Sequence, residues 1–164
     1  MNNIILCGFM GAGKTVVGRE LAKITGRRFI DTDEWIAREQ GMAIEAIFAA
    51  RGEEYFRELE HEACRHISQL KNCVVSTGGG ALTFERNVEA FKKKDRIVFL
   101  DASFEVICDR IGDNTSRPLF RDKEQAKALY EERKSLYEAA ADCVVDGDMS
   151  ARKAALTLAQ MLKK

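Results

Sequence analysis

The sequence predicts an α/β fold, a three-layer αβα sandwich around a five-stranded parallel sheet. Short apolar runs alternate with segments whose apolar residues recur at helical spacing, which is the pattern of repeated βα units. A glycine-rich loop joins the first apolar run to the first helical segment. The length of 164 residues suits one buried core and is short for two, so a single domain is expected over residues 1–164.

The phosphate loop, residues 8–15, reads GFMGAGKT and fits GxxxxGK followed by Ser or Thr at every fixed position. Residues 3–7 predict a strand before it, and residues 14–25 predict a helix after it, with Gly26 as the C-terminal cap. Strand, loop and helix thus occur in the order that nucleotide binding requires. The alternative is a glycine-rich turn with an incidental lysine, and the intact spacing disfavours it.

The residue types in the phosphate loop suit Mg²⁺-ATP. Glycines let the backbone approach a polyphosphate, so that N–H groups and the helix N-terminus face the anion. We expect the Lys14 ammonium on the β- and γ-phosphates and the Thr15 hydroxyl on Mg²⁺. The residues of this loop expected to contact ATP are Gly11, Ala12, Gly13, Lys14, Thr15 and Val16.

Two carboxylates follow the second predicted strand, residues 28–31. Asp31 and Asp33 stand where open α/β sheets bind ligands, and alternation in an extended segment would turn both toward the pocket. One could hold the metal while the other accepts a hydrogen bond from a substrate hydroxyl. Alternatively, these acids only cap the next helix, expected over residues 34–39.

Residues 34–70 have a helical pattern that breaks at Gly41 and Gly52. This connection is longer than a simple crossover, so we expect a helical insertion over about residues 33–62 that forms a substrate site. Arg57 adjoins the apolar stripe of the insertion. It could bind substrate or form surface pairs with neighbouring glutamates, and the residues alone leave both possibilities open.

A triple glycine ends the third strand, which is expected over residues 73–77. Glycine permits unusual backbone conformations and lets a ligand approach the main chain, which favours a second ligand-contacting turn over a merely flexible one. The three residues are Gly78, Gly79 and Gly80.

The position of a metal-binding acid is ambiguous. Many phosphoryl-transfer enzymes hold Mg²⁺ with an acid at the end of a buried strand. Ser76 stands at the end of the third strand, whereas Asp101 follows the fourth, expected over residues 96–100. The residues alone do not choose between them.

A lid is expected over about residues 112–123, after a helix that runs from about residue 103 to 110. This segment holds the only proline and many turn-forming residues. Arg117 at its centre and Arg110 at its base are suited to closing over ATP and excluding water. The alternative is a plain surface loop with ordinary arginines.

A helix expected over residues 123–139 places Ala126, Leu129, Leu136 and Tyr137 on one inward face, and Arg133 shares that face. A charge there is costly unless it is paired, so it meets either a protein carboxylate or an anionic ligand. A fifth strand, expected over residues 142–145, and one more helix complete the chain.

Composition argues against several functional classes. The chain has 26 basic and 26 acidic residues, and this formal net charge of zero offers no overall basic field for nucleic acid or an anionic membrane. No apolar run approaches the roughly 18 residues that span a bilayer, so a cytoplasmic location is expected. The five cysteines lack CxxC spacing, which favours reduced core residues over a zinc or redox site.

Alternating strands and helices, the phosphate loop and the expected lid indicate a small P-loop phosphotransferase of the nucleoside-monophosphate-kinase type. Six segments between residues 4 and 146 also resemble shikimate kinases in order and spacing. They read GFMGAGKTVVGRELA, FIDTD, GEEYFRELE, STGGG, RPLF and ERKSLYEAAAD. This combination is far more specific than the phosphate loop alone.

The resemblance implies a substrate site at matching positions. Asp33 would bind ring hydroxyls of shikimate, and Arg57 and Arg133 would bind its carboxylate. Within the triple glycine at residues 78–80, the N–H of Gly79 would donate to the substrate.

The resemblance also implies the metal and nucleotide contacts. Asp31 would support Mg²⁺ through water alongside Thr15, and Ser76 becomes the favoured outer contact to the metal. Arg117 matches the lid arginine at the phosphates, and Arg110 matches the arginine beside adenine.

The implied reaction is transfer of the γ-phosphate of ATP to the 3-hydroxyl of shikimate by a monomeric enzyme, giving shikimate 3-phosphate and ADP. Lys14, Asp33 and Arg117 are the expected catalytic residues. One alternative is a kinase for another small hydroxy acid, such as gluconate. A second is a nucleotide-switched binding module, although the sequence contains no NKxD guanine motif.

Overall fold

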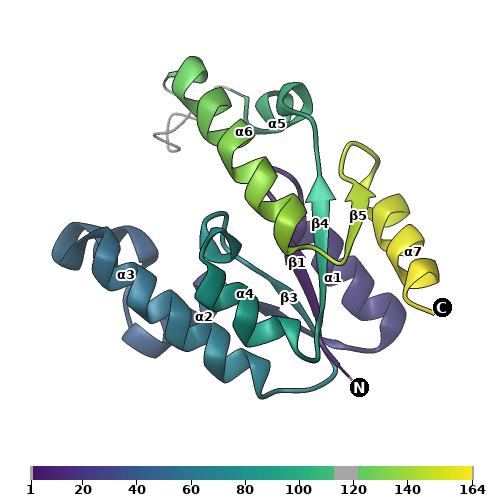
Figure 1. Cartoon of the computed structure of the whole chain (residues 1–164), viewed down its shortest axis with the longest axis horizontal. Helices are drawn as coiled ribbons and strands as arrows, with labels where there is room; N and C mark the ends of the chain where they lie inside the picture. The colour runs from purple at the N-terminus through teal and green to yellow at the C-terminus, as the bar shows by residue number, and fades with distance from the viewer. Residues whose placement is uncertain (1, 113–121, 164) are drawn as a thin grey trace.

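The computed structural model of the chain describes residues 2–112 and 122–163. Within these ranges, parallel strands form a five-stranded sheet in the order β2-β3-β1-β4-β5, with helices against both faces (Figure 1). The strands are β1 (Ile4–Cys7), β2 (Arg28–Asp31), β3 (Cys73–Ser76), β4 (Arg96–Asp101) and β5 (Cys143–Asp146). This arrangement confirms the predicted three-layer αβα sandwich.

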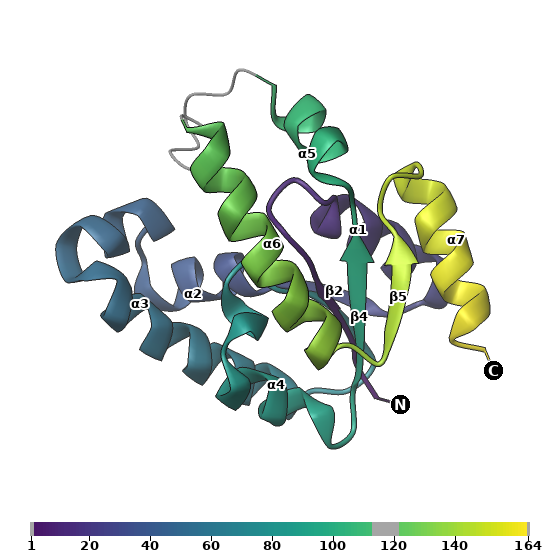
Figure 2. The same cartoon turned by 45° about the horizontal axis from the view of Figure 1, so that its top comes forward.

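Helices α1 and α7 pack together on one face of the sheet, and α3, α4 and α6 cover the other (Figures 1 and 2). The short helices α2 and α5 follow the carboxyl ends of β2 and β4, and the 3-10 turn η1 lies between β3 and α4. The bounds are α1 (Lys14–Thr25), α2 (Thr32–Gln40), α3 (Ile44–Ser68), η1 (Ala81–Thr83), α4 (Glu85–Lys92), α5 (Phe104–Ile111), α6 (Lys123–Ala140) and α7 (Ala151–Met161).

Strand side chains alternate between two apolar cores because neighbouring residues point to opposite faces. On β1, Ile5 packs in the core beneath α3, α4 and α6, whereas Ile4 and Leu6 pack in the core beneath α1 and α7. The sheet is therefore buried on both faces, as parallel sheets usually are. Because β1 lies between β3 and β4, the phosphate loop that follows it opens at the middle of the carboxyl edge.

The helical insertion has both of the predicted breaks. Helix α2 ends at Gly41, and α3 changes direction at Gly52, whose φ of 85° and ψ of 174° are not helical. A residue with a side chain would be strained in that conformation, so glycine fits the kink. Together α2 and α3 extend to one side of the sheet (Figure 2).

The predicted inward face of α6 is confirmed at Ala126 and Tyr137, which are buried, and is wrong at Leu136, which is 41% exposed. Tyr130 is also buried and was not predicted there. The two tyrosines lie seven residues apart, two turns along the same face, and their hydroxyls reach backbone carbonyls.

Most of the expected lid, including Arg117, lies outside the described residues. All five cysteines are free thiols; Cys7, Cys64 and Cys73 are buried as predicted, and Cys108 and Cys143 are half-buried. Among the described helices, none combines the length and apolar character needed to cross a membrane.

Candidate active site

The phosphate loop turns tightly around its glycines. Gly11 and Gly13 have φ values of 81° and 95°, in the left-handed region that favours glycine, and Gly13 is the N-cap of α1. The loop lines a cavity of about 310 Å³ together with the ends of β2 and β3. The N-terminus of α1 therefore faces this cavity, which suits an anion.

Lys14 is almost fully buried beneath the loop. Its Nζ donates to the carbonyl oxygens of Gly8 and Phe9. Burial lowers the pKa of Lys14 from 10.5 to about 8, although the nearby carboxylates of Asp33 and Asp31 oppose this shift. A phosphate bound at the loop would favour the charged ammonium and raise that pKa again.

Asp31 has two contacts in the site. Its Oδ1 accepts the backbone N–H groups of Asp33 (2.9 Å) and Glu34 (3.1 Å), so it caps α2. Its Oδ2 lies 3.4 Å from Oγ1 of Thr15. This one carboxylate therefore caps α2, as the alternative expected, and also lies beside Thr15.

Asp33 reaches the cavity by a different route from the one predicted. It lies in the first turn of α2, which begins at Thr32, and not in an extension of β2. Its Oδ1 is buried and has no hydrogen-bond partner within the described part of the chain. Burial, and next the charge of Asp31, raise the pKa of Asp33, while Lys14 and Arg57 oppose the rise.

The triple glycine makes room for charged side chains from three helices. A Cβ at Gly78 would lie 2.8 Å from Oδ1 of Asp33, and one at Gly80 would lie 2.7 Å from the Arg57 guanidinium. The nearest atom to a Cβ at Gly79 would be Nη1 of Arg133, at 3.5 Å. Positive φ values do not occur at these glycines, so the reason expected from backbone conformation is wrong. Glycine is needed here because a side chain at Gly78 or Gly80 would occupy the space of Asp33 or Arg57.

Gly80→Ala is expected to raise the KM for the acceptor about tenfold with little change in kcat. The new methyl group displaces the Arg57 guanidinium and so weakens its charge-assisted contact with an anionic acceptor. A tenfold rise in KM corresponds to a loss of about 1.4 kcal/mol in binding free energy. Steady-state kinetics at saturating ATP measure the effect. The matched variant Gly79→Ala, whose Cβ meets only ordinary contacts, should change KM less. An equal or larger effect at Gly79 would contradict the steric explanation.

Arg57 pairs with the glutamate three residues further on, as the alternative expected, but the pair is largely buried and does not lie on the surface. Its Nη1 lies 2.9 Å from Oε1 of Glu60, which is 1% exposed. The guanidinium also lies over the rings of Phe56 and Phe84, at 5.4 and 5.3 Å from their centroids. These contacts hold Arg57 beside the triple glycine.

Glu60 is a site residue that the sequence interpretation missed. The available signal was a glutamate three residues after Arg57, on the stripe that also carries Phe56 and Ala63. Burial raises the pKa of Glu60 from 4.5 to about 7, although Arg57 opposes the rise. Its charge therefore changes close to neutral pH.

Stability should depend on pH through Glu60. Between pH 4.5 and about 7 the Glu60 carboxyl is protonated in the folded state and ionised in the unfolded state. The stabilisation that this proton gives to the folded state is therefore complete below pH 4.5 and is lost as pH rises through 7. The free energy of unfolding of the wild type, relative to Glu60→Gln, should fall across this range by about 3 kcal/mol at most. Urea titrations at several pH values measure it. Glu58→Gln, in an exposed pair with Arg86, is the control and should give a flat difference. A flat difference for Glu60→Gln as well would contradict the raised pKa.

Arg133 faces the site without a carboxylate partner. Across residues 2–112 and 122–163, none of the ion pairs involves it. Its guanidinium lies 5.9 Å from the ring centroid of Phe9, and the hydroxyl of Tyr137, one turn further along α6, donates to the carbonyl oxygen of Gly79. Of the two alternatives for Arg133, an anionic ligand is therefore favoured over a protein partner.

The remaining predicted residues divide between two places. Ser76 is buried at the end of β3 and lines the same cavity as Thr15, whereas Asp101 lines a separate pocket and pairs with Lys134 at 3.8 Å. Arg110 donates to the carbonyl oxygens of Ala12 (3.0 Å) and Gly147 (2.6 Å), which connects the phosphate loop to the turn after β5. Arg117 lies outside the described residues.

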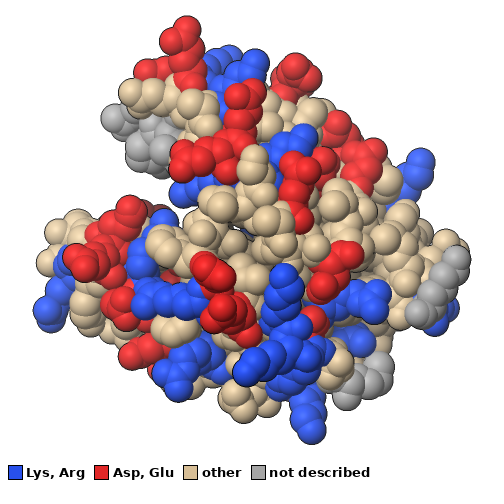
Figure 3. Space-filling model, viewed as in Figure 1, with Lys and Arg blue, Asp and Glu red and all other residues tan. Residues whose placement is uncertain are grey.

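The site therefore has two sides. The phosphate loop forms one side, and α3 and α6 carry the two arginines of the other. The space-filling view shows a hollow between the ends of these two helices (Figure 3). Such an arrangement can hold a polyphosphate opposite a small anion that also carries hydroxyl groups.

Known proteins are similar to this chain in sequence and fold. The family described as "Shikimate kinase" matches residues 10–163. The chain is 43% identical over 141 residues to a shikimate kinase of Sulfurihydrogenibium sp. (strain YO3AOP1), covering 85% of each. It is 40% identical over 167 residues to that of Helicobacter hepaticus, covering 100% of this chain and 98% of the other. A solved structure, shikimate kinase from Acinetobacter baumannii in complex with shikimate, has a TM-score of 0.92 at 35% identity and covers 99% of this chain and 93% of its own.

Proposed function

The chain belongs to the shikimate kinase family, and from this membership we propose that it transfers the γ-phosphate of ATP to the 3-hydroxyl of shikimate. The products are shikimate 3-phosphate and ADP. The observation that carries the proposal is the meeting of Asp33, Arg57 and Arg133 at the triple glycine, opposite Lys14. A polyhydroxy carboxylate needs cations beside its carboxylate and a hydrogen-bond acceptor beside a hydroxyl group. The two arginines supply the first and Asp33 supplies the second.

The acceptor is held by charge and geometry. Arg57 and Arg133 bind its carboxylate, because guanidinium groups match carboxylates with paired hydrogen bonds. The carboxylate of Asp33, which lines the cavity, accepts a hydrogen bond from the reacting hydroxyl, and the raised pKa of this carboxyl suits it to take the proton as the phosphoryl group leaves ATP. The N–H of Gly79 donates to the bound acceptor.

On the donor side, Lys14 and the N–H groups at the start of α1 stabilise the charge of the phosphates. The side chains beside them offer oxygen ligands that suit a hard cation such as Mg²⁺, which keeps several waters. These are the side chains of Thr15 and Asp31 and, as an outer contact through water, the hydroxyl of Ser76. When bound, Mg²⁺ would neutralise phosphate charge and orient the γ-phosphate. Arg110 would lie beside the adenine, since it bridges the phosphate loop and the turn after β5.

The direct test is ADP release from ATP with shikimate, with gluconate, or with no acceptor. We expect rapid turnover with shikimate only. Turnover that does not need shikimate, or none when it is present, would overturn the proposal. Preference for gluconate would keep the kinase chemistry and change the acceptor.

We also propose that the enzyme acts as a cytoplasmic monomer. The residues assigned to the site come from one chain, and five free thiols suit a reducing compartment. Light scattering on the purified protein, with and without both substrates, measures the oligomeric state.

A further inference from the structure

The triple-glycine turn at residues 78–80 is fastened to α2, the helix that carries Asp33. The hydroxyl of Thr32, the first residue of α2, accepts the N–H of Gly78 at 2.9 Å. Thr32 is fully buried, whereas its neighbour Asp33 lines the cavity. One residue of this helix therefore holds the turn, and the next residue faces the acceptor.

A second connection joins the turn to α3, which carries Arg57. Nδ2 of the buried Asn87, on α4, donates to the carbonyl oxygen of Ala81 at 2.8 Å. Oδ1 of the same side chain lies 2.9 Å from Nδ1 of His61, one turn after Arg57 on α3. The bridge from His61 through Asn87 therefore keeps α3 in register with the end of the turn.

Tyr137 supplies the connection to α6, which carries Arg133 one turn earlier. The Tyr137 hydroxyl donates to the carbonyl oxygen of Gly79. The residue is 1% exposed, and its ring packs against that of Phe99 with the centroids 5.3 Å apart. Burial raises the pKa of Tyr137, while the charges of Arg133 and Arg57 oppose the rise. The phenol therefore lies near both arginines and keeps the proton that it donates.

The bond from Tyr137 fixes one peptide unit of the turn. The carbonyl oxygen of Gly79 and the N–H of Gly80 belong to the same planar unit, so the hydroxyl sets the direction of both. The preceding unit is fixed by the N–H of Ala81, which donates to the carbonyl oxygen of Gly78 at 3.0 Å. In the described part of the chain, the N–H of Gly79 has no hydrogen-bond partner, which leaves it for a bound acceptor.

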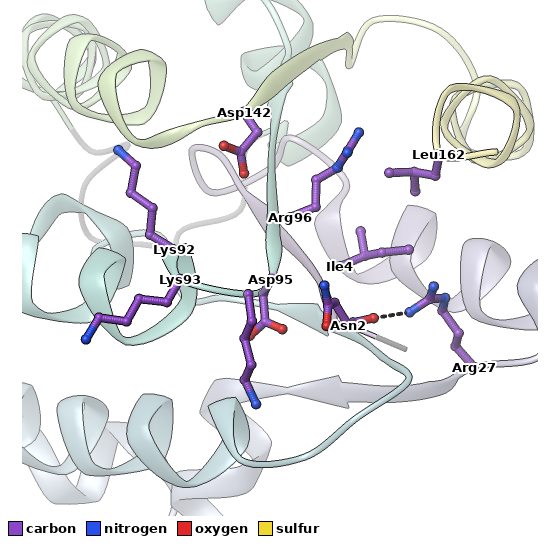
Figure 4. A pocket seen from close by; sticks show the side chains of 10 residues that line it. Asn2, Ile4, Arg27, Lys92, Lys93, Asp95, Arg96, Asp142 and Leu162 are labelled. Atoms are coloured by element: carbon purple, nitrogen blue, oxygen red, sulfur yellow. Dashed lines mark hydrogen bonds between the residues drawn. The ribbon is translucent and has the colours of Figure 1, made fainter. Parts of the chain in front are cut away.

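At the opposite edge of the sheet, similar bonds hold the starts of the strands to one another. Oδ2 of Asp142 accepts the N–H of Ile97 at 2.8 Å. Arg27 donates to the carbonyl oxygen of Asn2 (Figure 4). These bonds stabilise the sheet far from the acceptor site. At the triple glycine, by contrast, the bonds come from the helices that carry the acceptor residues, which indicates a role in positioning.

We propose that Tyr137 is a positioning residue for the acceptor. Its hydroxyl holds the turn against α6, so that the N–H of Gly79 and the guanidinium of Arg133 reach the same acceptor molecule. The turn and this guanidinium pack closely, since a Cβ at Gly79 would lie 3.5 Å from Nη1 of Arg133. This role rests on the proposed kinase function and gives the site a residue that does not itself contact the acceptor.

The test is Tyr137→Phe, which removes one buried oxygen and retains the ring. We expect the KM for shikimate to rise about tenfold, the upper range for one lost hydrogen bond. The KM for ATP and kcat should stay within about threefold of the wild type, which is the pattern of weakened acceptor binding. Steady-state kinetics with each substrate varied in turn measure these constants.

Tyr130→Phe is the matched control on the same helix. The Tyr130 hydroxyl also donates to a backbone carbonyl, that of Ala102 at 2.8 Å, which is not part of the triple glycine. Both variants should lower the temperature of thermal unfolding, because each loses one hydrogen bond from the interior. Tyr137→Phe alone should raise the KM for shikimate. Equal KM values in the two variants would overturn the proposal.

Amide NMR gives a second readout that does not depend on turnover. Without ligand, Tyr137→Phe should shift the amide signals of Gly79 and Gly80, and Tyr130→Phe should not. Titration with shikimate should saturate the Gly79 signal at about tenfold higher concentration in Tyr137→Phe than in the wild type. Identical titrations would overturn the proposal.

The wild type distinguishes failure of this role from failure of the proposed function. If the wild type releases no ADP in response to shikimate, the proposed function is wrong, and the ligand-free signals of Gly79 and Gly80 still decide whether Tyr137 holds the turn. If the wild type uses shikimate and Tyr137→Phe has the same KM, only the role of Tyr137 is wrong.

Discussion

Lys14→Met should lower kcat about 10³-fold, which is the upper end of the loss when one charge-stabilising donor is removed from an active site. Methionine has a similar length and fills the same buried space, but it offers no charge to the transferring phosphoryl group. Coupled measurement of ADP release at saturating shikimate gives the rate.

The control for this variant is Lys23→Met on the same helix. Lys23 is 77% exposed and pairs only weakly with Glu20, at 4.0 Å, so kcat should stay within about twofold of the wild type. Because Lys14 also donates to the carbonyl oxygens of Gly8 and Phe9, thermal unfolding of both variants should be compared. A folded Lys14→Met enzyme with near-normal kcat would exclude the proposed role.

Asp33→Asn should lower kcat about 10²-fold or more while leaving the affinity for ATP near normal. Asparagine retains the shape of the side chain but is a much weaker proton acceptor, and positioned general bases contribute about 10² to 10⁴. Phosphoryl transfer also depends on positioning, so part of the loss will come from a misoriented hydroxyl group. Single-turnover kinetics separate this chemical step from binding.

Glu34→Gln provides a matched control on the same turn of α2. Glu34 is exposed and lies 3.8 Å from Arg19, outside the cavity, and the substitution removes the same charge. It should leave kcat within about twofold of the wild type. Equal losses of kcat in the two variants would mean that the negative charge at the start of α2 matters, and not the Asp33 carboxylate itself.

The sequence was sufficient for most of the fold because its signals were local. The strand before the phosphate loop, the helix from Lys14 to Thr25 and the breaks at Gly41 and Gly52 each follow from spacing or from one residue type. Parallel pairing followed from the alternation of strands and helices. The order of the strands, with β1 in the centre, depends on contacts between distant segments and was not read from the sequence.

The site was harder to predict from the sequence because its geometry comes from contacts between different helices and strands. Asp33 could not be placed on a helix until the cap formed by Asp31 fixed where α2 begins. Glu60 looks like one of several surface glutamates until α3 is packed and its partner Arg57 is half-buried.

The triple glycine has a consequence for how acceptor preference can change. A larger residue at Gly78 or Gly80 collides with Asp33 or Arg57. A different charged residue on α2 or α3 must, for its part, pack against the main chain of the glycine turn. The two helices and the turn therefore have to vary together. A new acceptor would require paired substitutions, so evolution by single steps from this site passes through poorly active intermediates, and directed evolution should randomise both places at once.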